Sequence, residues 1–475
     1  MKKTGLTLLA ALLCAAAIAQ PKEVHIISVN DMHAKIENFP KFAAIVDSLR
    51  AVYPDLLILS AGDNRTGDPL NDLYEIPAYP MVALMNQVGF DASTLGNHEF
   101  DSNPYGLSRL ISLSNFPYIC ANVHPDPKYG IHLSPCKIFD LDGTKVGIVG
   151  AVALGTSGHP DTHPDNVVDI DFTPVTETIS EYAWLRADCD VVIALTHIGY
   201  EDDVALSAEI PWVDVIVGGH SHTQIDGGEM HNGILITQNL NRLPCLTHTT
   251  ITVNNGKVTG KKAENIDVEN YPRENKIVAE MVRFFSDNPA FQRVLCQFTK
   301  PVSTYEELGC MMTDAWRAET GADVAFTNYG GVRYDTLPAG PFTVSDALKL
   351  DPFGNQTVEL KLTGKELKDM LISCYVNDQD RFPVVSGILV KVFKDKKNPV
   401  KIKDITITNP DGSKFDLKKT YTVVTNSYSA VICNSPRQDP GRELNKQTVA
   451  FIQDYLEHQG SVDYSGVTRV SYAEK

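Results

Sequence analysis

The chain has 475 residues, of which 43% are hydrophobic and 21% are charged, and its formal net charge at pH 7 is −17. A chain of this length exceeds what one hydrophobic core usually serves, so we expect two domains. The negative charge argues against nucleic-acid duplexes as partners, because basic surfaces hold the phosphate backbone.

Residues 1–19 have the composition of an export signal. Lys2 and Lys3 form a charged start, residues 6–18 are mostly apolar, and residues 17–19 match a small-x-small cleavage site. The apolar stretch is short for a membrane span, and an uncleaved N-terminal anchor is the alternative. We expect a mature protein without a membrane anchor that is periplasmic or secreted.

Eight of the nine cysteines remain once residues 1–19 are removed. An even number of cysteines in an exported chain permits disulfides. The cysteines form no Cys-x-x-Cys pair, so buried free thiols are the alternative and the pairing stays open.

Residues 20–262 alternate short β-rich runs with helical stretches, which is typical of an α/β domain. The apolar runs at residues 24–29, 56–59, 191–195 and 213–217 are continuous rather than alternating. Strands that are buried on both faces have this pattern. We therefore expect a first α/β domain over residues 20–262.

A charged helical stretch follows the first domain. It runs through Ile277, Met281 and Phe285 and stops at Asn288-Pro289. We expect residues 263–290 to form an interdomain helix or linker, and a peripheral helix of the first domain is the alternative.

The remaining residues, 291–475, again combine a helical stretch with strand-like runs. The runs lie near Val324 and at residues 358–362, 388–393 and 421–425. They predict a second, smaller α/β domain.

Polar side chains follow the strand-like runs of the first domain where the strands end. These side chains are Asp31, His33, Asp63, Asn97, His98, Asp101, His197, His220 and His222. In open α/β sheets the ligand crevice lies beyond the carboxyl ends of the strands, so these segments converge. Imidazole suits Zn, Mn or Fe, and a carboxylate can bridge two ions. The pattern predicts a metal site, whose ions would supply the positive charge that the chain lacks.

The motifs Asp-x-His, Gly-Asp, Gly-Asn-His-Glu, an isolated histidine and Gly-His-Ser-His resemble the signature of the calcineurin-like metallophosphoesterases. The longer Gly-Asn-His-Glu-Phe-Asp and a downstream Asn-x-Gly-Gly-x-Arg at residues 328–333 resemble the 5′-nucleotidase family. This resemblance covers nearly the whole mature chain. It implies a four-layer metallophosphoesterase β-sandwich flanked by helices, followed by a smaller α/β substrate-binding domain.

The resemblance also implies two divalent metal ions, and the ligand set leaves open whether they are Zn, Mn or Fe. The implied ligands are Asp31, His33 and His222 for one ion, Asn97, His197 and His220 for the other, and Asp63 as the bridge. His98 would then act on the phosphoryl group, with Asp101 orienting its ring.

Substrate contacts are expected from both domains. Arg333 lies in a segment that resembles the family's Asn-Gly-Gly-Gly-Ile-Arg, with Tyr329 in place of a glycine. The resemblance implies that Arg333 binds phosphate or carboxylate-like groups of the substrate, and a structural salt bridge is the alternative. The family holds the base between two aromatic rings, and Phe382 and Tyr428 fall at plausible places for them, with core packing as the alternative. Arg65 is a further candidate for a bidentate phosphate contact, or else a loop arginine.

One segment departs from the family. After the second aromatic residue, nucleotidases carry a Gly-Gly-Asp-Gly-like stretch whose aspartate helps to hold the ribose. Residues 430–435 contain no acidic residue, and Asn434 is the candidate substitute. Hydrolysis of a phosphoester is therefore better supported than recognition of a nucleoside.

We predict an exported two-metal phosphohydrolase that hydrolyses nucleoside monophosphates or related small phosphate esters by metal-hydroxide attack. Within the same mechanism, alternatives are a UDP-sugar or cyclic-nucleotide phosphodiesterase, a non-nucleotide phosphoesterase or a thiosulfate-ester hydrolase. A metal-dependent binding or scavenging protein without turnover is the alternative of another class. The intact His98–Asp101 pair argues against it, because a binding protein has little need for such a pair.

Overall fold

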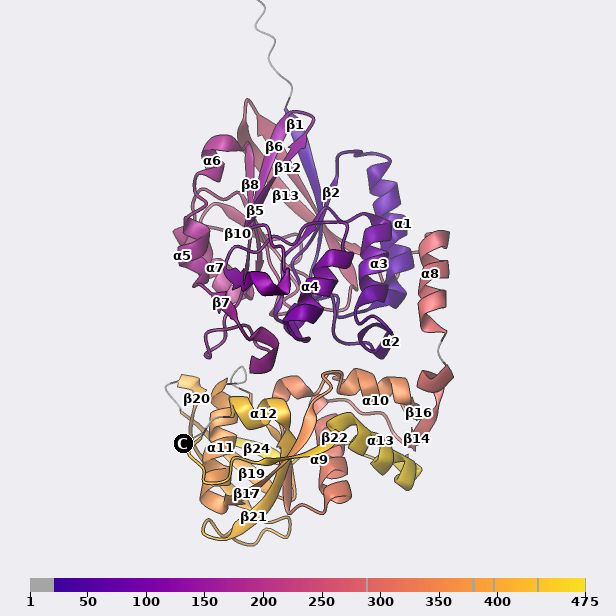
Figure 1. Ribbon diagram of the computed structural model, residues 1–475, viewed down its shortest axis with the longest axis vertical. Helices are drawn as coiled ribbons and strands as arrows, with labels where there is room; N and C mark the ends of the chain where they lie inside the picture. The colour runs from indigo at the N-terminus through magenta and orange to yellow at the C-terminus, as the bar shows by residue number, and fades with distance from the viewer. Residues whose placement is uncertain (1–20, 288, 378–380, 396–397, 434, 475) are drawn as a thin grey trace, which may run out of the picture.

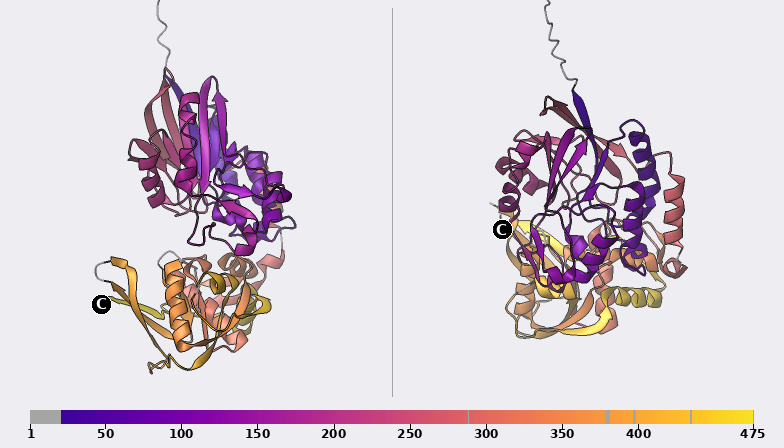
Figure 2. Two further views of the ribbon diagram at one scale, coloured as in Figure 1. Left: turned by 60° about the vertical axis from the view of Figure 1, so that its left-hand side comes forward. Right: turned by 45° about the horizontal axis from the view of Figure 1, so that its top comes forward.

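The computed structural model describes residues 21–287, 289–377, 381–395, 398–433 and 435–474. The export signal predicted for residues 1–19, and Asn434, lie outside these residues. The described chain forms two lobes, which are stacked in Figure 1 and separate in the left view of Figure 2. Within the described ranges, no helix combines the length and hydropathy that crossing a membrane requires.

Two β-sheets form the centre of the N-terminal lobe. The first contains, in order, β13 (Lys257–Asp267), β12 (Cys245–Asn254), β1 (Lys22–Val29), β2 (Leu57–Ser60) and β3 (Ala92–Ser93). The second contains β10 (Glu229–His231), β11 (Ile234–Thr237), β9 (Val215–Val217), β8 (Val191–His197), β6 (Thr144–Val152) and β5 (Cys136–Leu141). Strands β1, β2 and β3 are parallel, as are β6, β8, β9 and β11, so their carboxyl ends point to common edges.

The two sheets pack face to face. Successive side chains of a strand point to opposite faces. Val24 and Ile26 of β1 therefore join Val191 and Ile193 of β8 in an apolar layer between the sheets, while Ile27 packs toward the outer helices. The helices on the first sheet are α1 (Phe39–Arg50), α3 (Tyr79–Val88) and α4 (Pro104–Leu113), and those on the second are α5 (Val175–Ser180), α6 (Leu185–Asp188) and α7 (Tyr200–Glu209). This confirms the predicted four-layer sandwich. Shorter elements of this lobe are α2 (Pro69–Asp72), β4 (Val123–Pro125) and β7 (Ile170–Phe172).

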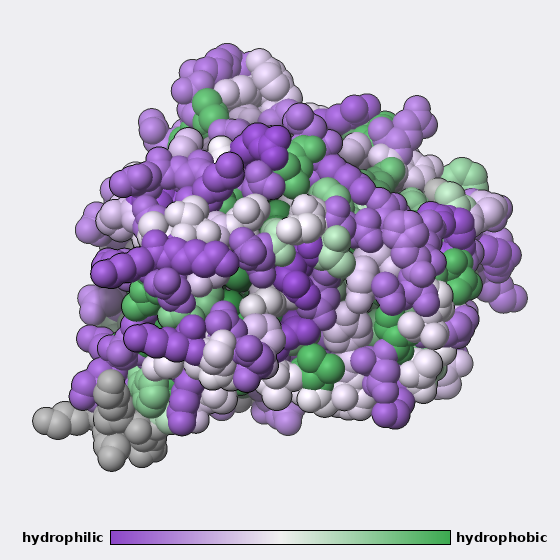
Figure 3. All heavy atoms as spheres, turned by 90° about the horizontal axis from the view of Figure 1, so that it is seen from below, coloured by the Kyte–Doolittle hydropathy of each residue, from purple (hydrophilic) through white to green (hydrophobic). Residues whose placement is uncertain are grey.

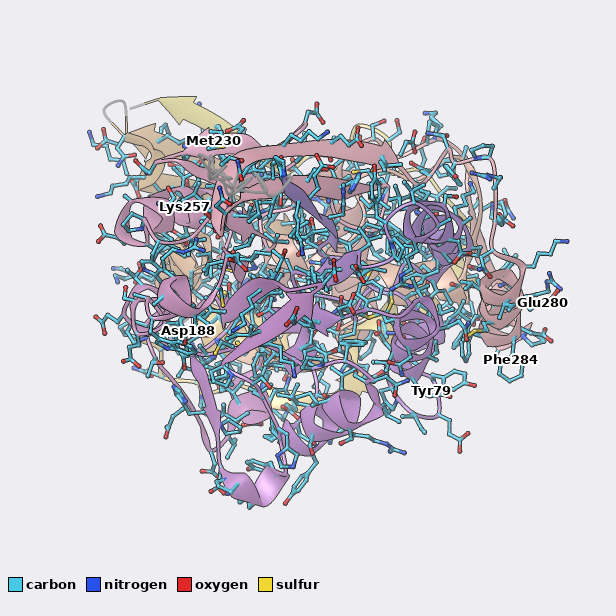
Figure 4. All side chains as sticks on the ribbon, turned by 90° about the horizontal axis from the view of Figure 1, so that it is seen from above. Tyr79, Asp188, Met230, Lys257, Glu280 and Phe284 are labelled. Carbon is cyan, nitrogen blue, oxygen red and sulfur yellow. The ribbon has the colours of Figure 1, made fainter. Side chains whose placement is uncertain are left out.

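Helix α8 (Lys276–Ser286) lies at the side of the N-terminal lobe (Figure 1). Asn275 caps it, because its side-chain oxygen accepts the backbone N–H groups of the first turn. Val278 and Phe285 enter the core beneath α1 and α3, whereas Phe284 projects outward and is 72% exposed (Figure 4). The helix thus packs as a peripheral helix of this lobe, and the exact domain boundaries stay a prediction.

The C-terminal lobe is built on a five-stranded sheet with the order β18 (Val384–Ser386), β15 (Val324–Thr327), β21 (Thr420–Asn426), β17 (Gln356–Thr363) and β22 (Arg442–Gln447). Ala325 of β15 packs toward α9 (Tyr305–Thr320) and α13 (Thr448–Gln459). Val324 and Phe326, on the other face, pack toward α11 (Gly364–Asn377). The lobe is therefore a second α/β unit, as predicted.

Two three-stranded sheets and two further helices complete the C-terminal lobe. They are β16 (Gly340–Thr343), β14 (Val294–Phe298) and β23 (Ser461–Val462), then β20 (Asn398–Thr408), β19 (Leu389–Asp395) and β24 (Val470–Glu474), with α10 (Val344–Leu350) and α12 (Ser427–Ile432). The face of the molecule seen from below is mostly hydrophilic, with apolar residues scattered singly (Figure 3). All eight cysteines in the described part of the chain are free thiols.

The two lobes touch through charged and aromatic side chains. Lys349 of α10 pairs with Asp68 at 2.6 Å and with Glu37 at 3.4 Å. Arg242 donates a hydrogen bond to the backbone oxygen of Arg333 at 2.5 Å. Because these contacts flank the carboxyl ends of the sheet strands, residues of the C-terminal lobe face the predicted metal site.

Candidate metal site and active-site cavity

The loops after β1, β2, β3, β8 and β9 bring the candidate ligands to one buried place between the lobes. Several of these loops adopt backbone conformations that are unusual for residues with side chains. Positive φ angles occur at Asp31, His33, Asp63, His220 and His222. Such conformations cost about 1–3 kcal/mol each and persist where the surroundings impose them, often at functional sites.

The candidate ligands form two neighbouring clusters. The first consists of Asp31, His33 and His222, and the second of Asp63, His197 and His220. In the first, His222 Nε2 lies 3.2 Å from His33 Nε2 and 3.3 Å from Asp31 Oδ1. In the second, His197 Nε2 lies 3.2 Å from Asp63 Oδ2. Asp63 Oδ2 also lies 4.0 Å from His33 Nε2, so this carboxylate stands between the clusters. The structure thus brings together the residues that the sequence pattern selected.

The seventh candidate ligand, Asn97, joins the second cluster. Its Oδ1 lies 3.0 Å from His220 Nδ1. Asn97 belongs to a short 3₁₀ helix, Asn97–Phe100, that follows β3 directly. The amide oxygen therefore faces the same space as the imidazoles, where it can serve as a ligand.

Hydrogen bonds to backbone oxygens orient two of the imidazoles. His33 Nδ1 faces the oxygen of Thr66 at 2.9 Å, and His197 Nδ1 faces that of Ala61 at 2.6 Å. These contacts place the proton on Nδ1 and direct Nε2 into the site, the usual arrangement for a metal-binding histidine. His197 Nε2 is buried and, although Asp63 Oδ2 lies 3.2 Å away, it meets the geometry of a hydrogen bond with none of the described residues. A divalent cation at this position would be coordinated by His197 Nε2 and the adjacent carboxylates.

The electrostatics of the cluster also fit a cation. Burial, with the Arg333 cation, lowers the pKa of His33 well below its usual value, and burial lowers the pKa of His220 to about 4. Both imidazoles are therefore neutral at pH 7 and have an electron pair to offer. Burial also disfavours a charged His197, but the carboxylates of Asp63 and Asp31 outweigh it and raise its pKa to about 10. A proton on His197 compensates the negative charge of the two buried carboxylates, and a bound metal ion would displace this proton.

His98 and Asp101 form a close pair beside the clusters. His98 Nδ1 lies 2.6 Å from Asp101 Oδ2, and His98 Nε2 lies 4.0 Å from Asp63 Oδ2. Burial lowers the pKa of His98, but the Asp101 and Asp63 carboxylates outweigh it and raise the pKa above its usual value. An imidazole held in this way is able to donate a proton.

Glu99 connects two of the ligand loops through hydrogen bonds. Its fully buried carboxylate accepts backbone N–H groups from Asp63 at 2.9 Å, Asn64 at 2.8 Å and Gly96 at 2.6 Å. The Gly-Asn-His-Glu motif placed Glu99 near the site, and the structure shows how it acts on the loops. It fixes the loop that carries Asp63 against the loop that carries His98.

A cavity of about 140 Å³ opens between the lobes beside His98. From the C-terminal lobe it is lined by Arg333, Phe353 and Tyr428. Arg333 Nη2 lies 3.2 Å from His33 Nε2, and the ring of Phe353 stacks 5.8 Å from that of His98. The cavity therefore joins a cation and aromatic rings to the metal-ligand cluster.

Two predicted substrate contacts lie elsewhere. Phe382 is 2% exposed and packs in the core beside Tyr375, so the structure does not bring it together with Tyr428 across the cavity. Arg65 is 6% exposed and donates to Ser102 Oγ at 3.0 Å. Its guanidinium supports the first-lobe loops. Arg65 is not among the described residues that line the cavity, and a phosphate contact from it stays a prediction.

Sequence reasoning did not select several of the lining residues as site residues. Phe353 and the loop residues Asp161, His163 and Asn166 line the cavity. The loop residues follow β6 without a recognisable motif, and Phe353 reaches the site only because the lobes pack together.

Comparisons with known proteins agree with this architecture. The family model described as calcineurin-like phosphoesterase matches residues 24–224, and that described as 5′-nucleotidase, C-terminal domain, matches residues 292–432. The chain is 28% identical to a 5′-nucleotidase of Vibrio cholerae over 535 residues, covering 95% of this chain and 94% of the relative. It is 26% identical over 470 residues to the trifunctional nucleotide phosphoesterase protein YfkN of Bacillus subtilis, covering 86% of this chain but 32% of that longer protein.

Solved structures share the fold. A 5′-nucleotidase precursor from Thermus thermophilus matches with a TM-score of 0.84 and 23% identity, over 95% of this chain and 99% of that chain. A sulfate thiohydrolase, SoxB, from the same organism matches with a TM-score of 0.76 and 17% identity, over 91% and 82%. The chain belongs to the 5′-nucleotidase family, in which a calcineurin-like phosphoesterase domain precedes a 5′-nucleotidase C-terminal domain, and it is a metal-dependent phosphoester hydrolase.

Proposed function

We propose that this chain is an exported two-metal phosphohydrolase that releases phosphate from nucleoside monophosphates or closely related monoesters. The observation that carries the proposal is the His98–Asp101 pair, which lies beside the shared carboxylate Asp63 at the end of a cavity between the lobes. A relative over nearly the whole chain is named 5′-nucleotidase, which supports the choice of substrate. Export rests on residues 1–19 alone.

The metal ions would be held by residues of both clusters. Asp31, His33 and His222 would hold one ion, Asn97, His197 and His220 the other, and Asp63 would contact both. When bound, divalent ions supply Lewis acidity to the phosphoryl oxygens and a nucleophile at neutral pH. The donor set accepts Zn, Mn or Fe.

His98 would protonate the leaving oxygen. Asp101 accepts the hydrogen bond from Nδ1, so Nε2 points toward the substrate cavity. The carboxylates of Asp101 and Asp63 raise the pKa of His98, which favours a protonated imidazole before the reaction. The proton then moves from Nε2 to the ester oxygen as the P–O bond breaks.

Arg333 and Tyr428 would bind the substrate from the C-terminal lobe. The guanidinium of Arg333 lies directly over the ligand cluster and is placed to pair with a phosphoryl oxygen. Tyr428 lines the same cavity and would offer an aromatic face to a base. Because Phe382 packs in the core, it would not form the second face of a clamp around the base.

The test is phosphate release from 5′-AMP by the mature protein, residues 20–475, supplied with Mn²⁺ or Zn²⁺. We expect release by the wild type and a loss of most of it in Tyr428→Ala through a higher KM. Hydrolysis of p-nitrophenyl phosphate without release from any nucleoside monophosphate would contradict the nucleotide substrate. Absence of both activities in metal-loaded protein would contradict the hydrolase proposal itself.

A further inference from the structure

The segment between β6 and β7, residues 153–169, reaches the active-site cavity beside His98 and Asp101. One of its residues, Thr162, is 3% exposed and lines the cavity. The backbone N–H of Thr162 donates to the oxygen of Pro160 at 2.8 Å, which fixes the position of the residue. The segment therefore presents one buried hydroxyl group to the proposed proton donor and its carboxylate partner.

The two oxygens of the Asp101 carboxylate have different partners. Oδ2 lies 2.6 Å from His98 Nδ1, whereas Oδ1 accepts a hydrogen bond from Thr162 Oγ1 at 3.3 Å. The same hydroxyl lies 3.1 Å from the backbone oxygen of Phe100. A hydroxyl has one proton to donate, and a carboxylate is a stronger acceptor than a peptide oxygen. Thr162 is thus placed to hold the carboxylate oxygen that His98 does not use.

A further contact directs the proton of this hydroxyl. Asn166, which also lines the cavity, donates from Nδ2 to Thr162 Oγ1 at 3.2 Å. Because this N–H group occupies a lone pair of the hydroxyl oxygen, the hydroxyl proton points away from Asn166 and toward Asp101 and Phe100. A chain of hydrogen bonds therefore runs from Asn166 through Thr162 and Asp101 to His98. Each member limits the rotation of the next.

The residue before Thr162 holds the other end of the same short helix, Asn97–Phe100. The side chain of Asn97 donates from Nδ2 to the backbone oxygen of Asp161 at 3.3 Å, so its Oδ1 is directed toward His220. Because this contact uses the backbone of Asp161, it does not depend on the hydroxyl of Thr162. A substitution of Thr162 can therefore disturb Asp101 while the candidate metal ligand Asn97 keeps its partner.

We propose that Thr162 is a positioning residue for the proton donor, because its hydroxyl holds Asp101 in the orientation that directs His98 Nε2 toward the leaving oxygen. This inference rests on the proposed function of the same site. As the P–O bond breaks, its electron pair stays on the ester oxygen, and the proton of His98 Nε2 moves to that oxygen. Thr162 exchanges no proton and touches no reacting atom.

This role gives Thr162 a signature that a purely structural residue lacks. A leaving group that is a weak acid needs a proton as it departs, whereas p-nitrophenolate is stable enough to leave without one. Loss of the Thr162 hydroxyl should therefore slow esters of weakly acidic alcohols and phenols more than p-nitrophenyl phosphate. A general loosening of the fold would slow all esters alike.

The experiment compares phenyl phosphate with p-nitrophenyl phosphate in the metal-loaded protein, because the two esters differ mainly in the acidity of the phenol that leaves. Thr162→Val keeps the shape of the side chain and removes the hydroxyl. It should lower kcat for phenyl phosphate about tenfold, since part of the general acid contribution is lost, and change kcat for p-nitrophenyl phosphate less than about twofold. KM and metal content should stay unchanged. Thr162→Ser, which keeps the hydroxyl, should restore kcat, and Thr162→Ala should behave like Thr162→Val.

Two further variants serve as controls. In the background of His98→Ala, Thr162→Val should cause no additional loss, because a residue that acts through His98 has nothing left to position. Thr178→Val removes another buried threonine hydroxyl, which donates to the backbone oxygen of Pro174 at 2.8 Å in α5. This variant should leave the ratio of the two kcat values as in the wild type.

The outcomes separate this inference from the proposed function. If the wild type hydrolyses both esters and Thr162→Val and Thr162→Ala have wild-type kcat, the role of Thr162 is overturned and the proposed function stands. Equal losses on both esters, or a further loss in the His98→Ala background, would also overturn it, because Thr162 would then act on the fold. If the metal-loaded wild type hydrolyses neither ester, both proposals are overturned.

Discussion

At the scale of single residues, the two ring nitrogens of His98 have different roles: one orients the ring and the other faces the substrate. Nδ1 is held by Asp101 at 2.6 Å, and Nε2 faces the cavity. We expect His98→Ala to lower kcat by about 10²–10⁴-fold, the usual contribution of general acid catalysis. Phosphate release measures this loss, and metal analysis of the same protein should show unchanged metal content. A variant with wild-type kcat would refute the role of His98.

A second residue-scale prediction concerns the pH dependence of stability. His25 Nδ1 lies 3.1 Å from His248 Nε2, and its ring stacks on Tyr53 at 3.6 Å. Burial, together with His248, lowers the pKa of His25 below 6.5. Below pH 6.5 the unfolded chain therefore binds a proton that the native chain resists. The free energy of unfolding should fall as the pH drops from 6.5 toward the native pKa.

Urea unfolding at pH 7.5 and pH 5.5 tests this prediction. The wild type should lose more stability between these values than His25→Gln, which keeps a polar side chain but has no proton to bind. An equal loss in both proteins would mean that His25 does not contribute to the pH dependence.

At the scale of elements, four of the five ligand loops were predictable because they follow continuous apolar runs; the loop with Asn97 and His98 was found by its Gly-Asn-His-Glu motif. Asp31 and Asp63 follow β1 and β2, and parallel strands bring their carboxyl ends to one edge. Phe382 was not predictable, since hydrophobicity does not distinguish an aromatic residue of the core from one of a cavity. Phe353 reaches His98 only through the packing of the two lobes, which no local pattern encodes.

Glu99 provides the element-scale prediction, because it holds two loops through three backbone N–H groups. In Glu99→Gln one carboxylate oxygen becomes an NH₂ group, which cannot accept a hydrogen bond. Depending on the amide orientation, either the N–H of Asn64 or those of Asp63 and Gly96 lose their acceptor. We expect a stability loss of about 1.5–3 kcal/mol, and weaker metal binding because the Asp63 loop is less fixed. Chemical denaturation and metal titration measure the two effects. Glu75→Gln, at an exposed position, is the control, and equal behaviour of the two variants would contradict the role of Glu99.

At the scale of the whole molecule, the active-site cavity depends on how the lobes sit against each other. The metal ligands come from the N-terminal lobe, while Arg333 and Tyr428 come from the C-terminal lobe. A substrate that touches both must enter and leave between them, so movement about α8 would accompany turnover. Contacts that cross the interface at a distance from the substrate should then govern how readily the lobes separate.

Lys349 makes such a contact, since it pairs with Asp68 and Glu37 across the interface. Burial raises the pKa of Asp68 to about 6 even though the Lys349 cation opposes the shift. The charged form of this carboxylate is therefore stabilised by Lys349. Lys349→Met should therefore destabilise the protein by about 3 kcal/mol. It should also increase the radius of gyration in small-angle scattering and raise KM more than it changes kcat. Lys365→Met, which breaks an exposed pair within α11, should do neither. A destabilised Lys349→Met with unchanged radius and KM would mean that the pair stabilises the fold without holding the lobes together.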